Sequence, residues 1–487
     1  MDTKSLEILE FPEIKKILAG YTSFPVSNEL VLRLEPLSDY NEVSLRLRQS
    51  TEARYLLSLD RDFTVSGAFD TREDVRLAAL GKILEPKKLV EIQQTLAIAR
   101  QVRSSLNEMS KEVPLMWDIA KGIEYLSGTE REIARCLSPS GEVLDHASSE
   151  LTVIRAQLKE TREILVKRLE GIMRTPRGRK IIQEPIIIER SGRYVVSVKL
   201  EFRKEMKGIT HDVSNTGASV YVEPWSTVDL GNTLRELHTA QMREIERILR
   251  NLSITVGVKE AEILQNISRL AELDVIMAKA AYALSVRAVE PVLLNPSEEL
   301  DQDNPRVFIK LIDARHPLLG HKAVPLSVEI GKEFSILIIT GPNTGGKTVA
   351  LKTIGLLSLM TQAGIPIPAS SETQMPIFDS VFADIGDEQS IEQTISSFSW
   401  HVGNIVRIVS NTTSRSLILL DELGTSTDPT EGSALARSIL LHFLTSSTLT
   451  IATTHYADLK AFAHMTPGLQ NASFDFDPVT LMPTYHM

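Results

Sequence analysis

The segment from Gly341 to Thr348 has the residue types and spacing of a phosphate-binding loop. Four residues separate Gly341 from Gly346, and Lys347 and Thr348 follow at once, in the order G-x-x-x-x-G-K-[ST]. Five strand-forming residues precede the loop and an apolar helical run follows it. Backbone N–H groups in such a loop surround phosphate oxygens at a helix N-terminus. The segment therefore predicts that the chain binds a nucleoside triphosphate.

Two side chains of this loop have predicted roles of their own. The Lys347 ammonium would reach the terminal phosphates, and the Thr348 hydroxyl would ligate Mg²⁺. A glycine-rich turn that only starts a helix is the alternative, and Lys-Thr at this spacing after a strand pattern disfavours it. The predicted nucleotide-binding residues of the loop are Gly341, Pro342, Asn343, Thr344, Gly345, Gly346, Lys347 and Thr348.

Two carboxylates, Asp421 and Glu422, follow a second apolar run, Ser416 to Leu420. A parallel strand buried on both faces has this pattern, and its acidic end lies at the ligand crevice. Asp421 would hold Mg²⁺ through water, and Glu422 would orient and deprotonate the attacking water. Without the loop, solvated surface carboxylates would be the better interpretation. A third run ends at His455, which could sense the terminal phosphate or the water, although a histidine there is more often structural.

Composition limits the remaining possibilities. A chain of 487 residues with 43% hydrophobic and 24% charged residues is expected to form two to four globular domains. The net charge of −10 requires any nucleic-acid surface to be a local basic patch. Cys136 is the only cysteine, which excludes an internal disulfide and a cysteine-rich metal site. With no signal-peptide core and no apolar run of about eighteen residues, we expect a cytoplasmic protein without a membrane segment.

The pattern of apolar residues divides the chain into segments. Helical periodicity dominates the first part, and a longer helix is predicted over 147–173. The period then changes to two, before helical periodicity returns over 228–249 and 261–284. The pattern predicts two long helices carrying a small β module at their tip. The predicted strands of this module cover 185–190, 193–199, 209–213 and 218–223. An acidic, proline-rich linker over 290–305 precedes the nucleotide-binding part.

Positive charge gathers in the β module, although the chain is acidic elsewhere. A local reversal of sign is typical of a surface that binds a phosphate backbone. Sparse aromatic residues favour recognition of backbone or shape over stacking on bases. Solvated strand and turn positions are the alternative interpretation. The residues predicted to contact nucleic acid are Arg190, Arg193, Arg203 and Lys204.

A hydroxyl-rich loop precedes Asp421 by about 25 residues and leads into a helix. Ser396 and Ser397 stand at the head of this helix. In ATPases of the ABC type, the loop that binds the nucleotide of the partner subunit lies at this place. A simple N-cap is the alternative, since serine before a helix usually has that role.

Together these motifs resemble the ATPase of the MutS superfamily. The motifs are Gly341 to Thr348, Asp421 to Asp428, Ala452 to His455 and Ser396 to Phe398. Residues 189–199 and 217–224 further resemble the bacterial MutS type II branch, and the resemblance covers essentially the whole chain. It implies a mixed fold, with a helical core, lever helices carrying a β clamp and an ABC-like P-loop ATPase domain. The corresponding segments are 1–146, 147–290 with the clamp insert at about 174–224, and 291–487.

The resemblance also implies a function. It implies a homodimer that hydrolyses ATP with Mg²⁺, with two sandwiched nucleotides, Ser396 supplied by the partner subunit and His316 near the adenine. The branch binds branched DNA to suppress homologous recombination, and senses and splits collided ribosomes, which would add ribosomal RNA as a partner. The sequence does not choose between these roles. Mismatch repair is not expected, because the mismatch-reading domains have no counterpart here.

Two further expectations concern the limits of this resemblance. Family members continue into a C-terminal Smr nuclease domain, so we expect a truncated chain and nuclease activity only in a longer parent. A nucleotide-binding subunit of an ABC transporter is the alternative function. The LSGGQ-type signature of such a subunit is absent, and the first 300 residues are too long and helical for it. A phosphotransferase using the same loop is disfavoured by Glu422 beside Asp421.

Overall fold

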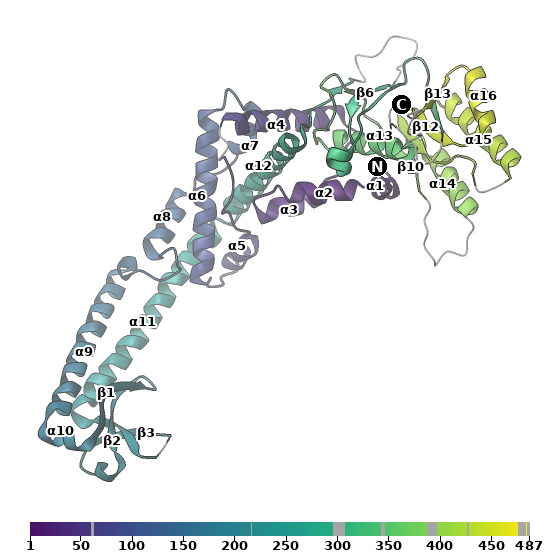
Figure 1. Cartoon of the computed structure of the whole chain (residues 1–487). Coiled ribbons are helices and arrows are strands. Elements are labelled where there is room, and N and C mark those ends of the chain that lie inside the picture. The colour runs from purple at the N-terminus through teal and green to yellow at the C-terminus, as the bar shows by residue number, and fades with distance from the viewer. Residues whose placement is uncertain are drawn as a thin grey trace. The chain divides into compact units, whose positions relative to one another are not determined.

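The structure is a computed structural model that describes most of the chain (Figure 1). The described residues are 1–59, 63–215, 217–295, 307–341, 346–386, 397–425, 428–475 and 484. Five predicted site residues lie outside them: Pro342, Asn343, Thr344, Gly345 and Ser396. Helices and several sheets are both present, so the predicted mixed fold class is confirmed at this level. Among the described helices, none is long and apolar enough to cross a membrane.

Packing divides the chain into two compact units, each assembled from stretches that are separated in sequence. The first unit contains residues 1–67, 101–123 and 265–487, and the second contains residues 68–100 and 124–264. The three segments predicted from the sequence are consecutive, whereas each of these units is built from separate stretches of the chain. In the structure the N-terminal helices share one unit with the nucleotide-binding part.

A five-stranded parallel sheet forms the centre of the first unit. Its strand order is β10-β11-β12-β8-β13. The inner strands β8, β11 and β12 are buried runs made mostly of apolar and β-branched residues, as expected for a parallel sheet covered on both faces, whereas the edge strand β13 is largely polar. The bounds are β8 (Ile336–Thr340), β10 (Ser380–Asp384), β11 (Ser416–Leu420), β12 (Leu449–Thr454) and β13 (Leu469–Ser473). The three strands predicted next to the chemical motifs are thereby confirmed.

Alternate residues of this sheet belong to two different cores. Leu337 and Leu417 belong to the core of α13, whereas Ile336 and Ile418 belong to the core of the other covering helices. This alternation buries both faces, because successive side chains of a strand point to opposite sides. The covering helices are α13 (Lys347–Gln362), α14 (Ser397–Asn411), α15 (Pro429–Thr445) and α16 (Ala457–Met465).

Smaller elements complete the first unit. Leu9, Phe11 and Ile14 join the same core as α13, so the N-terminal helices pack against the nucleotide-binding part. The helices are α1 (Thr3–Ile8), α2 (Phe11–Ala19), α3 (Pro25–Leu32), α4 (Tyr40–Leu59) and α7 (Pro114–Ala120). A second sheet has the order β5-β9-β6-β7, with β5 (Val292–Leu293), β6 (Ile309–Ala314), β7 (Leu326–Ile330) and β9 (Gln374–Met375), and η3 (Pro317–Lys322) follows β6. Two helices, α6 (Pro86–Glu108) and α12 (Glu260–Val286), have residues in both units.

The second unit contains the predicted pair of long helices and the β module. Helices α9 (Ser149–Arg174) and α11 (Trp225–Val258) run side by side, with the β module at one end of the pair (Figure 1). The module is an antiparallel sheet of order β1-β2-β4-β3. Its strands are β1 (Ile182–Arg190), β2 (Arg193–Lys199), β3 (Gly208–Val213) and β4 (Ser219–Pro224), which confirms the four predicted strands. The remaining elements are α5 (Arg72–Ala79), α8 (Ser127–Cys136), α10 (Pro176–Ile181), η1 (Asp145–Ala147) and η2 (Leu200–Phe202).

A buried lysine joins α12 to the end of α13 in the first unit. The Lys279 side chain is 4% exposed, and its Nζ donates a hydrogen bond to the Ala363 carbonyl at 2.9 Å. A cation at this place is favoured by the partial negative charge of a helix C-terminus. Desolvation, together with a smaller effect of the positive charge of Arg46, nevertheless lowers the pKa of Lys279 to about 7.

This burial predicts a pH dependence of stability. Between pH 7 and about 10 the unfolded chain holds a proton on Lys279 that the folded chain has released, so folding stability rises with pH. For one group the rise is at most about 1.4 kcal/mol per pH unit. We expect Lys279→Met to remove this rise, measured as the urea midpoint of the first unit at pH 7, 8 and 9. Exposed Lys460→Met is the control, and parallel pH curves for the parent and Lys279→Met would contradict the prediction.

Candidate active site

The lysine of the phosphate-binding loop lies buried between the ends of β8 and β12. Lys347 begins α13 and is 1% exposed. Its Nζ donates to the Gly341 carbonyl at 2.6 Å and lies 3.3 Å from His455 Nε2. Desolvation lowers the pKa of Lys347, while the negative charges of Asp421 and Glu422 oppose that effect. The ammonium is therefore pre-placed at the point where the strands end.

Glycine is required at both described ends of this loop. Gly341 has φ 132° and Gly346 has φ 91°, and side chains rarely adopt such backbone angles. Gly346 is also the N-cap of α13, so the helix N-terminus faces the loop. Backbone N–H groups at that end have no partner within the helix and suit an anion.

The predicted metal-binding pair is assembled by two neighbouring elements. Thr348 Oγ1 in the first turn of α13 donates to Asp421 Oδ2 at 2.7 Å. The Asp421 carboxylate is buried at the end of β11, and its other oxygen accepts from Thr453 Oγ1 at 2.5 Å. A hydroxyl and a carboxylate that converge in this way are hard oxygen ligands, and a site with one such carboxylate plus phosphate oxygens is what Mg²⁺ prefers. The residues present therefore fit a Mg²⁺ ion.

Glu422 adopts a backbone conformation that is unusual for its residue type. Its φ is 49°, in the left-handed region that disfavours residues with a side chain. Its N–H donates to Thr453 Oγ1 at 2.8 Å, which helps to hold this conformation. The side chain is about one-third exposed, and its Oε1 lies 3.7 Å from His455 Nε2. Strained backbone of this kind clusters at active sites, where the surrounding structure holds it in place.

A cavity of about 280 Å³ lies beside the described end of the phosphate-binding loop. Gly346 lines it together with His316, and the remaining lining residues are mostly apolar: Leu319, Lys322, Ala323, Val324, Leu326, Val349, Ala350, Thr353 and Phe474. His316 is 6% exposed, and its Nδ1 has no hydrogen-bond partner among the described residues. Burial lowers the pKa of His316, so the ring is neutral at pH 7. A planar, polar-edged group fits such a pocket, and an orphaned ring nitrogen can bind its edge.

The structure thus brings together five residues predicted from separate motifs. Lys347, Thr348, Asp421, Glu422 and His455 meet where β8, β11 and β12 end, as expected for ligand sites of parallel sheets.

The predicted signature residues are not placed by the structure. Ser396 lies outside the described residues. Ser397 begins α14, although its side chain is also outside the description. Their role in a dimer therefore remains a prediction.

Two residues of the site were not predicted from the sequence. The fully buried Thr453 hydroxyl bridges the Asp421 side chain and the Glu422 backbone. The backbone carbonyl of Asp384, at the end of β10, accepts the Asp421 N–H at 2.8 Å. The available signals were a hydroxyl two residues before His455 and a carboxylate closing another apolar run. Neither signal shows that Thr453 or Asp384 contacts Asp421, because that depends on which strands lie side by side.

The predicted nucleic-acid residues of the β module have different surroundings. Arg190 and Lys204 are exposed, and the Arg190 guanidinium lies 5.0 Å from the Tyr221 ring centre. Arg203 is half-buried. Arg193 instead pairs with buried Glu223 at 3.3 Å, and it also donates to Asn232 Oδ1 at 2.7 Å.

The bridging hydroxyl generates a prediction for turnover. Thr453→Ala leaves a buried carboxylate oxygen and the Glu422 N–H without their partner. We expect ATP turnover to fall about tenfold or more, because both acids lose their fixed positions. Nucleotide affinity should change little, and Thr453→Ser should restore turnover because it keeps the hydroxyl. Turnover and binding of a fluorescent ATP analogue measure the two effects, and equal turnover of Thr453→Ala and Thr453→Ser would refute the bridging role.

The family model and the relatives that match this chain both carry the name MutS. The family model described as MutS domain V matches residues 337–482, which include the parallel sheet and the five residues above. The chain is 44% identical over 492 residues to a protein named Endonuclease MutS2 from Thermomicrobium roseum, covering 100% of this chain and 62% of the relative. It is 43% identical to Endonuclease MutS2 of Geobacillus sp. and 42% identical to that of Pelotomaculum thermopropionicum, covering 100% of this chain and 61% of each relative.

The chain therefore spans about three fifths of the length of the curated relatives that it matches. The similarity includes the helical part and the β module as well as the five-stranded parallel sheet, since it extends over the whole chain. Residues 337–482 thus match MutS domain V, and over its whole length the chain is similar to MutS2 proteins of the MutS superfamily.

Proposed function

We propose that this chain is an ATP-hydrolysing clamp that works as a homodimer on nucleic acid. The observation that carries the hydrolytic part is the contact of Thr348 Oγ1 with Asp421 Oδ2 at 2.7 Å, next to buried Lys347. A hydroxyl, a carboxylate and an ammonium at the ends of parallel strands are the parts that P-loop ATPases use on terminal phosphates. No observation favours a transport ATPase.

Each residue of the site has a role in this proposal. Lys347 binds the terminal phosphates of ATP, and Thr348 and Asp421 hold Mg²⁺, which supplies positive charge to the phosphate oxygens. Glu422 accepts the proton of the attacking water. His455, which lies near both Lys347 and Glu422, orients the water or the terminal phosphate.

The remaining contacts of ATP belong to the loop and the cavity. The backbone of Gly341, Pro342, Asn343, Thr344, Gly345 and Gly346 surrounds the phosphates. The adenine enters the cavity lined by His316, whose free Nδ1 can accept a hydrogen bond from the exocyclic amine.

Dimerisation and nucleic-acid binding complete the proposal. Ser396 and Ser397 contact the nucleotide of the partner subunit from the head of α14. The exposed Arg190 and Lys204, with Arg203, contact phosphates of branched DNA or of ribosomal RNA, and the protein acts in the cytoplasm. Both suppression of recombination and splitting of collided ribosomes suit this surface. We assign the nuclease activity named in the relatives to the part of them that this chain does not match.

Two substitutions separate binding from hydrolysis. Lys347→Ala is expected to abolish nucleotide binding, because it removes the buried charge that meets the phosphates. Glu422→Gln is expected to keep binding and to lose on the order of 10² or more in turnover, the size typical of a lost general base. Purified variants are compared by phosphate release and by binding of a fluorescent ATP analogue. Glu422→Gln with the turnover of the parent would rule out the proposed role of this carboxylate.

The same Glu422→Gln protein tests the dimer. ATP that binds only the associated state stabilises that state by linkage. We expect sedimentation to show more dimer at saturating ATP with Mg²⁺ than without nucleotide. Lys347→Ala serves as the control and should not respond to ATP. An unchanged distribution for Glu422→Gln would count against the contact in trans.

The β module predicts a salt-dependent affinity. We expect Arg190→Glu, Arg203→Glu and Lys204→Glu together to weaken nucleic-acid binding and to flatten its log-log salt slope, by roughly 0.9 per lost phosphate contact on duplex DNA. Arg193 stays unchanged, because reversing it would leave Glu223 buried beside another carboxylate. Fluorescence anisotropy over a salt series, with duplex, four-way junction and structured RNA, measures the change.

The control for this experiment is an equal change of charge elsewhere. Lys111→Glu, Arg131→Glu and Lys460→Glu reverse three exposed charges outside the β module. This variant should retain the slope of the parent. If the two triple variants bind all three ligands alike, the binding surface lies elsewhere.

A further inference from the structure

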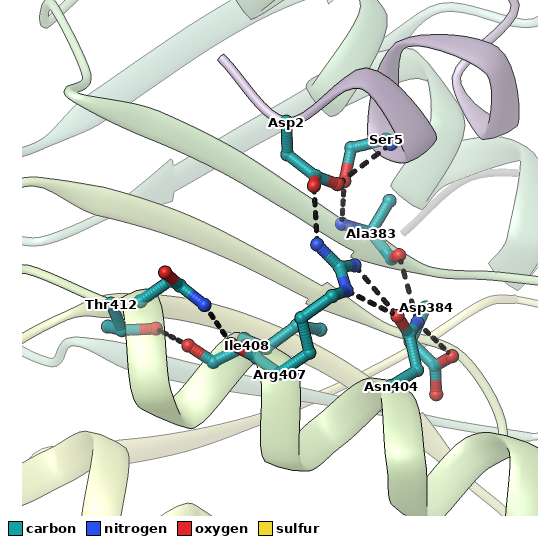
Figure 2. Close-up of polar contacts among 9 residues, drawn as sticks. Asp2, Ser5, Ala383, Asp384, Asn404, Arg407, Ile408 and Thr412 are labelled. Atoms are coloured by element: carbon teal, nitrogen blue, oxygen red, sulfur yellow. Dashed lines mark hydrogen bonds and ion pairs between the residues drawn. The ribbon is translucent and has the colours of Figure 1, made fainter.

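A closed ring of hydrogen bonds ties the start of the chain to the edge of the ATPase sheet (Figure 2). It joins three segments of the first unit that are far apart in sequence: residues 2–5, the end of β10 and helix α14. None of these contacts belongs to the nucleotide site described above. Two of them end on Ala383 and on the Asp384 carboxylate, however, and the backbone carbonyl of Asp384 accepts the Asp421 N–H.

The first half of the ring runs from α1 to β10. Asp2 caps α1 by accepting the Ser5 N–H at 2.9 Å, and it also accepts from the Ser5 hydroxyl. The Ser5 hydroxyl oxygen accepts the backbone N–H of Ala383 at 2.9 Å. Ser5 is 1% exposed and Ala383 is fully buried, so water cannot replace this contact.

The second half runs along α14. The Arg407 guanidinium pairs with Asp2 and donates twice to Asn404 Oδ1, at 2.7 and 3.1 Å. Asn404 Nδ2 then donates to Asp384 Oδ1 at 2.6 Å, and His401 Nδ1 lies 2.9 Å from the other Asp384 oxygen. Residues three apart share one face of a helix, so on this face of α14 His401 and Asn404 contact the strand end, and Arg407 contacts Asp2.

Asp384 connects the ring to the site. It closes β10, which pairs in parallel with β11, and its carbonyl accepts the Asp421 N–H at 2.8 Å. The Asp384 carboxylate is occupied by Asn404 and His401, so it positions its neighbours and is not placed as a metal ligand. A shift of α14 or of the β10 end would therefore be passed to the backbone that carries Asp421 and Glu422.

Ser5, Asp384 and Asn404 of this ring are buried and Asp2 and Arg407 are partly exposed, and such a polar ring is a poor way to gain stability alone. Apolar residues of similar volume often stabilise a protein as much as a buried ion pair or more, whereas satisfied polar networks fix one arrangement of their members. The ring lies one hydrogen bond away from Asp421, so its fixed arrangement can hold this residue of the site in place.

We propose that Asp2, Ser5 and Arg407 are positioning residues of the hydrolysis site, acting through Asn404 and Asp384 on the backbone of Asp421. This inference rests on the proposed ATP hydrolysis. Residues 2–5 do not line the cavity beside the phosphate-binding loop, so loss of their contacts is expected to act on turnover and not on ATP binding. The same ring holds α14, the helix headed by Ser397.

The test compares Asp2→Ala, Arg407→Ala and the double variant with the parent. We expect kcat for ATP to fall about five- to tenfold in each single variant, with KM and analogue affinity within about twofold, since small misplacements of catalytic groups act on turnover. The kcat of the double variant should be no lower than that of the less active single variant, because both changes open the same ring. Asp2→Asn keeps a single acceptor oxygen, which can cap Ser5 or accept from Arg407 but not both, so its kcat should lie between those of Asp2→Ala and the parent.

Glu13→Gln is the matched control, because it removes an exposed ion pair with Lys16 on the neighbouring helix α2. It should match the parent in every measurement. Parental kcat in Asp2→Ala, a parallel loss of analogue binding, or additive losses in the double variant would each overturn the proposal.

A second readout does not depend on hydrolysis. Hydrogen exchange of residues 397–411 should be faster in Asp2→Ala and Arg407→Ala than in Glu13→Gln, while the β module is unaffected. Unchanged exchange of α14 would overturn the ring as a positioning element. A parent that binds ATP without turning it over would refute the proposed function instead, and the exchange of α14 would still decide whether residues 2–5 hold this helix.

Discussion

The position of one buried carboxylate determines most of the site. Asp421 is held by Thr348 on one oxygen, by Thr453 on the other, and by the Asp384 carbonyl through its N–H. These partners come from α13, β12 and β10, so the carboxylate is in place only when the sheet has its observed strand order. A buried carboxylate whose two oxygens both accept hydrogen bonds is tolerated, whereas the same charge without them would be strongly destabilising. The sheet and the site therefore depend on each other.

The parts that the sequence predicts well are local. The loop from Gly341 to Thr348, the run ending at Asp421 and the strand ending at His455 each carry their pattern within about ten residues, and the structure has strands and helices at those places. The β module follows the same logic, since alternation of period two predicts its four strands within three residues of their observed bounds. Placement of side chains at a common edge followed from the rule that parallel strands end together.

The parts that the sequence did not predict depend on pairing between distant segments. Thr453 is an ordinary hydroxyl in an apolar strand until β12 is known to lie beside β11. Arg193 has the charge expected of a phosphate contact, yet Glu223 and Asn232 hold it within the module. The ring through Asp2 is of the same kind, because Ser5 and Ala383 are 378 residues apart. Periodicity and motif spacing carry no information about such partners.

The discontinuous make-up of the first unit has a consequence for biosynthesis. Its N-terminal helices leave the ribosome long before β10 and α14, and the whole second unit is synthesised between them. Because loop closure over such a separation is slow compared with local folding, the second unit can fold first while residues 1–67 wait for their partners. Apolar residues such as Leu9, Phe11 and Ile14 stay without their native core during that interval. An unfinished chain is thus both unable to assemble Asp421 with its partners and prone to association, so chaperones that bind exposed apolar helices would act on this protein early.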